Sequence, residues 1–199
     1  MDKSEIVVEK EYHKRSFARA FKEQDLYYTP SILVNCLVPY LVTWRDMFIM
    51  NNAREPVIWL PFDDEKSKYV EILQKVGFHI VRSHINEDKD FFKYEPEQWD
   101  IAVSNPPFSR KLDIFKRHIN DFTNKPFIYL MNMMAINYQN ISHLFYEVSP
   151  DIQFIIPDKK VSFDGNTSSF CSGYVCYKFI KQTEFIHLEN NNTKENFRK

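Results

Sequence analysis

Short apolar runs alternate with amphipathic segments along most of the chain. Three amphipathic segments repeat apolar residues with the period of a helix, and they span 65–76, 111–122 and 141–146. Six apolar runs have the length and the Val, Ile, Phe and Tyr content of buried strands, and they span 57–60, 78–81, 100–103, 126–131, 152–156 and 174–180. A weaker run, Phe91-Phe92, indicates one further short strand. Gly77 follows the first helical segment, where a left-handed C-terminal residue is expected.

The alternation of strands and helices predicts an α/β fold with a mostly parallel sheet and helices on both faces. The last two runs, 152–156 and 174–180, have no helix between them and are expected to pair antiparallel. The 199 residues suffice for one domain with a sizeable core. We expect a helical extension over 1–24, a main globular domain over 25–185 and a polar tail over 186–199.

A long apolar helix is predicted to begin at Thr29-Pro30 and to run to about Phe48. Threonine is a favoured N-cap, and proline is favoured at the first helical position. Pro39 lies inside this segment and is expected to kink or split it, because proline cannot donate the backbone hydrogen bond of a helix interior.

Composition and charge narrow the class of protein. Apolar residues make up 44% of the chain, as in ordinary globular proteins, and the formal net charge is −1. The whole molecule therefore does not attract nucleic acid electrostatically, although local basic clusters occur. These clusters are Lys10 to Lys22, then Arg110, Lys111, Lys116 and Arg117, and then Lys159 with Lys160. The alternative for each cluster is a solvated helix face.

Cysteine usage and hydropathy bear on the compartment. The three cysteines, Cys36, Cys171 and Cys176, contain no CxxC pair, which indicates neither a disulfide framework nor a zinc site. No leader sequence is recognised, and no uninterrupted apolar run reaches the ~18 residues of a membrane span. We therefore expect a cytoplasmic protein without a membrane partner.

The most informative motif is Asn105-Pro106-Pro107-Phe108, one residue after the apolar run 101–103. Asn105 and Pro106 both precede a proline and are biased toward extended backbone, while the prolines fix their own φ and lack an N–H. The loop should therefore be stiff and should present carbonyl oxygens, an amide side chain and an aromatic ring. That set suits a planar amino group. The alternative is a rigid turn without chemistry.

This motif in its strand context resembles the S-adenosylmethionine-dependent methyltransferases that act on amino groups, in particular the N6-adenine family and its small phage and prophage members. The resemblance covers about residues 25–180. It implies a Rossmann-like class I fold with a seven-stranded, mostly parallel sheet whose last strand is antiparallel. It also implies S-adenosyl-L-methionine as cofactor. The Asn105 side-chain oxygen and the Pro106 carbonyl would accept the amine hydrogens, Pro107 would stiffen the loop, and Phe108 would stack on the base.

The cofactor residues implied by the resemblance lie on three loops. Phe62 matches the aromatic residue of the first signature, but the glycines of that signature are absent. Either Asp63 and the following helix start form a different cradle, or cofactor binding is weakened. The alternative for Asp63 and Asp64 is helix capping. Ser83-His84 occupies the place of the acidic residue that usually binds the ribose hydroxyls. The alternative for His84 is an ordinary surface histidine.

Asp90-Phe91 matches the third signature, in which the carboxylate receives the adenine amine of the cofactor and the next residue packs on the ring. The alternative is a loop aspartate followed by a core phenylalanine. Tyr28-Thr29-Pro30 matches the element before the cofactor domain, and its helix N-terminus is a candidate for the methionine carboxylate. Asn105 also borders the cofactor in this family.

On the substrate side, the resemblance implies a second aromatic residue against the base, with Phe163 and Phe170 as candidates. Lys159 and Lys160 are candidates for phosphate contacts. The expected partner is nucleic acid, with the adenine N6 amine in DNA as the favoured acceptor, flipped out if the DNA is duplex. RNA, the side-chain amide of a protein glutamine, and a non-enzymatic binding protein on a degenerate scaffold remain alternatives. We expect no large recognition domain in these residues, so specificity should be low or come from short insertions, a homodimer partner or the N-terminal helix.

Overall fold

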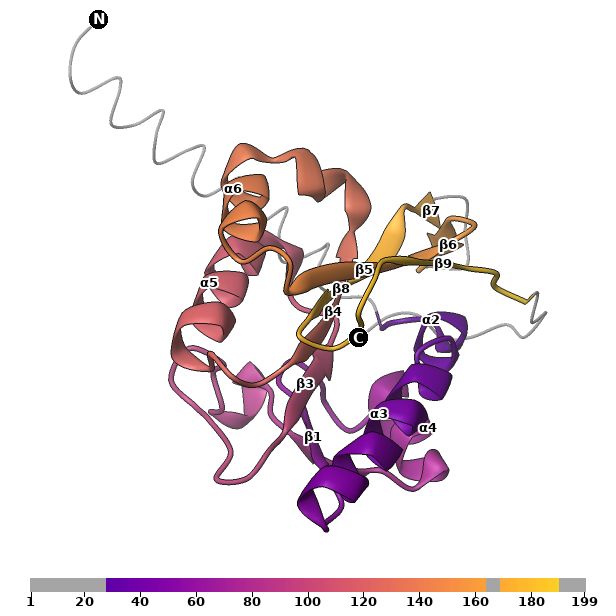
Figure 1. The fold of residues 1–199 in the computed structure, drawn as a ribbon, viewed down its shortest axis with the longest axis vertical. Coiled ribbons are helices and arrows are strands. Elements are labelled where there is room, and N and C mark those ends of the chain that lie inside the picture. The colour runs from indigo at the N-terminus through magenta and orange to yellow at the C-terminus, as the bar shows by residue number, and fades with distance from the viewer. Residues whose placement is uncertain (1–27, 164–168, 190–199) are drawn as a thin grey trace, which may run out of the picture.

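The computed structural model describes residues 28–163 and 169–189. The predicted extension over 1–24 and the part of the predicted tail after 189 lie outside the described residues. A seven-stranded sheet forms the centre of the molecule, in the order β2-β1-β3-β4-β8-β5-β9 (Figure 1). Its strands are β1 (Val57–Leu60), β2 (His79–Arg82), β3 (Ile101–Ser104), β4 (Phe127–Asn132), β5 (Ile152–Pro157), β8 (Ser172–Tyr177) and β9 (Glu184–Ile186).

The sheet is mostly parallel, which confirms the predicted α/β class. β1 pairs parallel with β2 and β3, β3 pairs parallel with β4, and β5 pairs parallel with β9. β8 is antiparallel to both β4 and β5, which confirms the predicted pairing of the two late runs. Two details of the prediction were wrong. The antiparallel strand is not the last one, because β9 follows it, and Phe91-Phe92 forms a turn rather than a strand.

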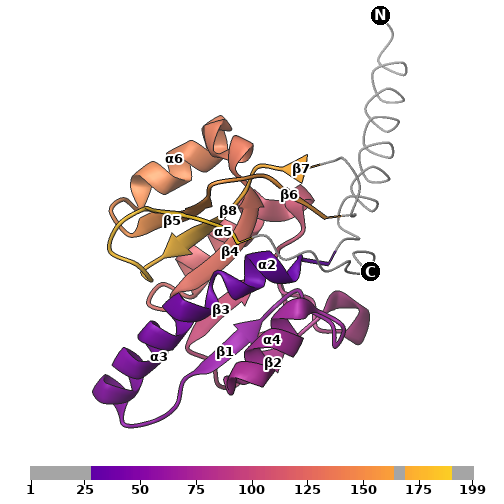
Figure 2. The same cartoon turned by 90° about the vertical axis from the view of Figure 1, so that its right-hand side faces the viewer.

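Helices cover both faces of the sheet, as Figures 1 and 2 show. The α-helices are α2 (Ser31–Asn35), α3 (Val38–Asn52), α4 (Lys68–Val76), α5 (Lys111–Asp121) and α6 (Gln139–Glu147). Three 3-10 helices also occur, η1 (Ile85–Glu87), η2 (Phe108–Arg110) and η3 (Met133–Asn137), together with a small hairpin of β6 (Val161–Ser162) and β7 (Ser169–Phe170). The first three α-helices pack on one face, and α5 and α6 pack on the other.

The side chains of each strand alternate between two hydrophobic cores. In β1, Ile58 and Leu60 lie in the core beneath α2, α3 and α4, whereas Trp59 lies in the core beneath α5 and α6. In β3, Val103 and Ala102 divide in the same way. This division follows from the period of two in a strand, and a strand covered on both faces therefore reads as a continuous apolar run.

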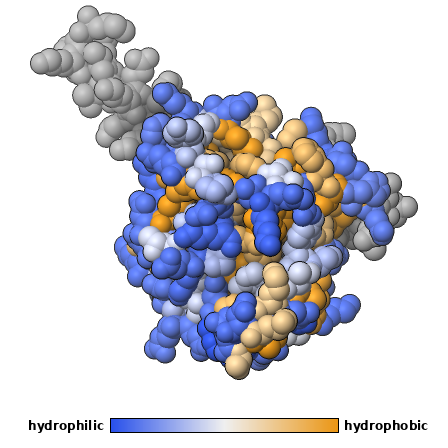
Figure 3. Space-filling view, in the orientation of Figure 1, coloured by the Kyte–Doolittle hydropathy of each residue, from blue (hydrophilic) through white to orange (hydrophobic). Residues whose placement is uncertain are grey.

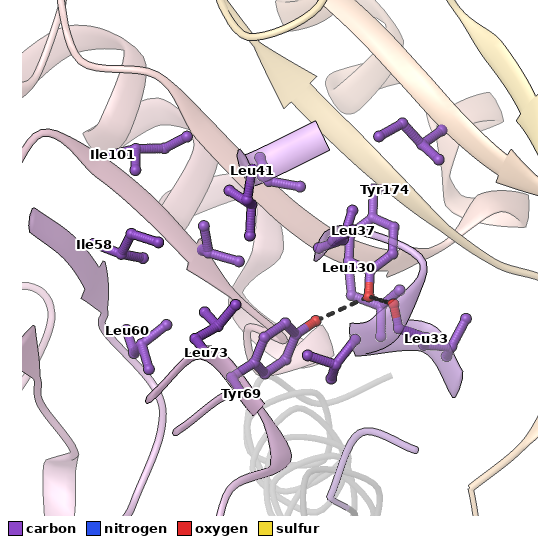
Figure 4. Packing of buried hydrophobic residues seen from close by; sticks show 14 of the residues in the cluster. Leu33, Leu37, Leu41, Ile58, Leu60, Tyr69, Leu73, Ile101, Leu130 and Tyr174 are labelled. Carbon is purple, nitrogen blue, oxygen red and sulfur yellow. Dashed lines mark hydrogen bonds between the residues drawn. The ribbon is translucent and has the colours of Figure 1, made fainter. Parts of the chain in front are cut away.

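The first predicted helix is divided, as expected from Pro39. The chain breaks between α2 and α3, and Pro39 occupies the first turn of α3. The predicted N-cap was wrong, because Pro30 rather than Thr29 holds that position and no side chain caps α2. Thr29 is buried and hydrogen-bonds the Tyr69 hydroxyl instead. That hydroxyl lies 3.2 Å from the Tyr174 hydroxyl, which donates to the Leu33 carbonyl at 2.8 Å (Figure 4).

Helix α4 shows how local sequence fixes its ends. The Ser67 hydroxyl accepts a hydrogen bond from the Tyr69 N–H and caps the N-terminus. Gly77 ends the helix with φ 91°, as predicted, in a conformation that side chains rarely adopt. Tyr69, Val70 and Leu73 form the buried face of the helix.

One helical stretch in the described part of the chain, Ser31–Asn52, is long and apolar enough to cross a membrane by length and composition alone. Core helices of soluble proteins pass the same test. In this fold, Leu33, Val34, Leu37 and Leu41 of the stretch belong to the core beneath the sheet.

Candidate functional site

The predicted catalytic loop lies at the carboxyl end of the sheet, beside a topological switch point. From β1 the chain passes to β2 on one side, whereas the next strand, β3, pairs on the other side of β1. In open α/β sheets, ligands bind outside the carboxyl ends of the strands at such a point. The loops that begin at Pro61 and at Asn105 lie on either side of this switch point. The sheet therefore brings the predicted cofactor and catalytic segments together at its carboxyl end.

The side chain of Asn105 has an unusual environment at the carboxyl end of the sheet. Its Oδ1 is buried and has no hydrogen-bond partner. Leaving a buried acceptor unpaired costs about 1–3 kcal/mol, so each such atom in a folded protein calls for an explanation.

A second buried atom without a hydrogen-bond partner, among the described residues, is an Nη1 of Arg117. The Arg117 guanidinium lies over the rings of Phe91 and Phe122, 5.0 Å from each centroid. The negative ring faces compensate its charge. Asn105 has no comparable compensation from the residues described, and its oxygen is therefore a candidate for a ligand contact.

The two prolines that follow Asn105 lead directly into η2. Pro106 is buried, and Pro107 is the N-cap of η2 with φ −58° and ψ 123°. The Pro107 carbonyl accepts a hydrogen bond from the Arg110 N–H at 3.2 Å. Phe108 opens η2 and is partly exposed.

Asp63 connects the two loops of the switch point. Its carboxylate is 4% exposed and accepts a hydrogen bond from the Ser67 hydroxyl at 2.5 Å. The other carboxylate oxygen accepts from the hydroxyl of Ser104, the residue that precedes Asn105. Asp63 therefore ties the β1 loop and the start of α4 to the end of β3. This arrangement differs from a helix cap, because Ser67 caps α4.

Asp64 stabilises the same loop from the outside. Its carboxylate accepts from the Lys66 N–H and from the Tyr28 hydroxyl, each at 2.9 Å. Burial and the neighbouring Asp64 raise the pKa of Tyr28 to about 12. The predicted segment Tyr28-Thr29-Pro30 thus does pack against the first cofactor loop. Helix α2 has only five residues, however, and its start is buried, so its N-terminus is a poor site for a carboxylate.

The loop after β2 is held by local hydrogen bonds. Ser83 is buried, and its hydroxyl accepts from the Trp59 indole N–H at 2.9 Å. His84 is the N-cap of η1, where its Nδ1 accepts from the Asn86 N–H at 3.2 Å. Asp90 is partly exposed, and its Oδ1 accepts from the Phe92 N–H at 3.0 Å.

The aromatic residues near Asp90 differ in exposure. Phe91 is 3% exposed and stacks on Trp59 with a centroid distance of 5.4 Å, so it is a core phenylalanine. Phe62 is partly exposed and packs 4.8 Å from Phe91. Phe92 lies under the Arg110 guanidinium, 3.9 Å from its ring centroid. Arg110 thereby joins the loop of Asp90 to the loop of Asn105.

The predicted substrate residues in the β6–β7 hairpin have mainly structural contacts. Phe163 is 3% exposed and packs against Phe170 at 5.6 Å. The Lys159 ammonium donates to the Leu188 carbonyl, while Lys160 is exposed. Phe163 therefore belongs to the core rather than to a surface that meets a base.

Sequence reasoning missed Tyr138, which lies near the predicted catalytic loop. The Lys111 ammonium lies 5.9 Å from the Phe108 ring centroid and 5.5 Å from that of Tyr138. Tyr138 lies between η3 and α6 and is 60% exposed. Its signal in the sequence is a lone aromatic residue in the polar stretch Asn137-Tyr138-Gln139-Asn140.

The three cysteines are free, and burial raises the pKa of the Cys36 thiol to about 12. In the ranges 28–163 and 169–189, no group of three or more His, Cys, Asp or Glu side chains is arranged to hold a metal ion.

Comparison with known proteins assigns no family to this arrangement. No protein-family model matches the chain, and no curated protein is similar to it at a significant level.

Proposed function

We propose that this protein is an S-adenosylmethionine-dependent methyltransferase that acts on the exocyclic N6 amine of adenine, with DNA as the favoured polymer. The observation that carries the proposal is the unpaired, buried Oδ1 of Asn105, in a proline-stiffened loop at the switch point of the sheet.

An acceptor at this place suits the chemistry of an aromatic amine. The lone pair of adenine N6 is delocalised into the ring, so the amine is a poor nucleophile. Acceptance of its hydrogens by the Asn105 Oδ1 and the Pro106 carbonyl localises the lone pair and offsets the positive charge that develops on nitrogen. The ring of Phe108 supplies the stacking surface, and attack on a methyl group then requires mainly alignment.

The cofactor supplies an electrophilic sulfonium methyl group when bound. The side chains that fit it are Phe62 and His84, together with the Asp90 carboxylate, on the loops after β1 and β2. Asp63 has a different part in the proposal. Because serine hydroxyls donate to both of its oxygens, it positions the start of the Asn105 loop rather than binding the cofactor.

The overall fold is compatible with a Rossmann-like methyltransferase. The sheet is mostly parallel, and its antiparallel strand β8 comes late in the chain, although β9 follows it. The glycines of the first signature are missing, however, and Asp64 and Tyr28 pack in that region. Cofactor binding by this loop is therefore the step that most needs a test.

The proposal is tested by methyl transfer from tritiated S-adenosylmethionine to separate pools of DNA, RNA and protein, followed by nucleoside analysis. We expect label in N6-methyladenine from DNA. Label only in RNA would keep the reaction and change the polymer. Absence of transfer to every pool, with no calorimetric binding at millimolar cofactor, would overturn the proposal in favour of a non-enzymatic scaffold.

A further inference from the structure

Tyr138 is an exposed aromatic residue next to the catalytic loop. It is 60% exposed, and η3 and α6 on either side of it pack into the sheet through Ala135 and Ile141. Single exposed apolar or aromatic residues are common, and Figure 3 shows apolar residues reaching the surface among polar ones. Exposure alone is therefore no argument for a site at Tyr138.

Lys111 distinguishes Tyr138 from the other exposed aromatic residues. Its ammonium lies within cation–π distance of both Tyr138 and Phe108, the ring that would stack on the target base. One positive charge therefore lies near two aromatic rings, one of them in the catalytic loop. Aromatic rings next to a cation are the usual means of binding single-stranded nucleic acid.

Two neighbouring cations, Arg110 and Arg117, pair with carboxylates of the protein. Arg110 pairs with Asp113 at 3.3 Å and covers Phe92, and Arg117 pairs with Asp121 at 3.5 Å. Duplex binding depends on neutralising many phosphates, and a chain with a net charge of −1 carries little excess positive charge for this. A single strand needs fewer ionic contacts, because its unpaired bases present faces for stacking.

We infer that the acceptor is single-stranded nucleic acid, and that a nucleotide next to the target base stacks on Tyr138 while Lys111 binds the phosphate between them. This inference rests on the proposed function, because it takes Phe108 as the stacking partner of the target base. It assigns the second aromatic contact to Tyr138 instead of Phe163, which is buried, or Phe170, whose ring packs against Phe163.

The test measures binding rather than catalysis, by fluorescence anisotropy without cofactor. The probe is a labelled oligodeoxynucleotide with one adenine in a thymine run, as a single strand and annealed to its complement. We expect the single strand to bind more tightly. Tyr138→Ala should weaken its binding by about five- to 150-fold, the loss typical of one stacked base. Tyr138→Phe should retain binding, because stacking does not require the hydroxyl.

The matched control is Tyr146→Ala, which removes a tyrosine that is 81% exposed on α6. It should leave binding unchanged. Unchanged binding by Tyr138→Ala, an equal loss in Tyr146→Ala, or preference for the duplex would overturn the inference. Failure of the proposed function would instead appear as absence of methyl transfer to any pool, which is distinguishable because the binding assay requires no transfer.

Discussion

The hydrogen bond between Ser104 and Asp63 gives the sharpest prediction for stability at the site. Ser104→Ala removes the hydroxyl that donates to a carboxylate oxygen of a 4% exposed aspartate. Hydrogen bonds to charged groups contribute about 1.5–3 kcal/mol, and Asp63 is largely shielded from solvent. We therefore expect the free energy of unfolding to fall by about 2–3 kcal/mol, a substantial share of the ~5–15 kcal/mol typical of a domain.

The assay is urea unfolding of the wild type, Ser104→Ala and a control, Ser142→Ala. Ser142 is exposed and its hydroxyl bonds the neutral backbone carbonyls of Ile136 and Tyr138, so removing it should cost about 1 kcal/mol or less. A double-mutant cycle with Asp63→Asn should then give a coupling energy of about 1 kcal/mol or more, because the two side chains touch. Equal losses in Ser104→Ala and Ser142→Ala, or additivity in the cycle, would refute the reasoning.

The same bond has a functional consequence. Because Ser104 precedes Asn105, loss of the bond should lower kcat for methyl transfer while the Kd for S-adenosylmethionine stays near that of the wild type. If the Kd rises and kcat is unchanged, Asp63 is a cofactor ligand rather than a positioning residue.

Three further predictions follow from single residues. Burial lowers the pKa of His118 from 6.5 to about 3. The stability contributed by the neutral side chain is therefore complete above pH 6.5, and the free energy of unfolding should fall by about 1.4 kcal/mol per pH unit as the pH drops toward 3. His118→Gln should flatten this pH dependence, measured by urea unfolding. Gly77→Ala should cost about 1–2 kcal/mol in thermal unfolding, because φ is 91° while a Cβ would meet nothing within 4 Å; an unchanged Tm would contradict this. Asp90→Ala should raise the calorimetric Kd for S-adenosylmethionine, and an unchanged Kd would remove Asp90 from the site.

Elements with a strong local signal could be predicted from the sequence. The buried strands read as apolar runs, Gly77 marked a helix end, and Pro39 marked the division between α2 and α3. Strand β9 could not be predicted, because its three residues form no apolar run and its Phe185 is exposed. The strand depends on its pairing with β5. Thr29 was misplaced because burial against Tyr69 outweighed its preference for a cap.

In the candidate site, too, some features follow from the local sequence and others only from the fold. The position of Asn105 at a strand end follows from local sequence, because a proline pair ends the apolar run before it. The bond between Asp63 and Ser104 joins residues 41 apart in the chain, so only the fold reveals it. Phe163 and Phe91 looked like candidate stacking residues, but a phenylalanine in a core and one in a binding site have the same local sequence signal.

The most direct test of the account compares the wild type with Asn105→Ala in two measurements, the rate of methyl transfer to adenine and the Kd for S-adenosylmethionine. Loss of a polar group aimed at a developing charge typically lowers kcat by about a hundredfold or more. The account predicts a loss of at least that size with the Kd for the cofactor nearly unchanged. A variant that transfers methyl groups as fast as the wild type would contradict it.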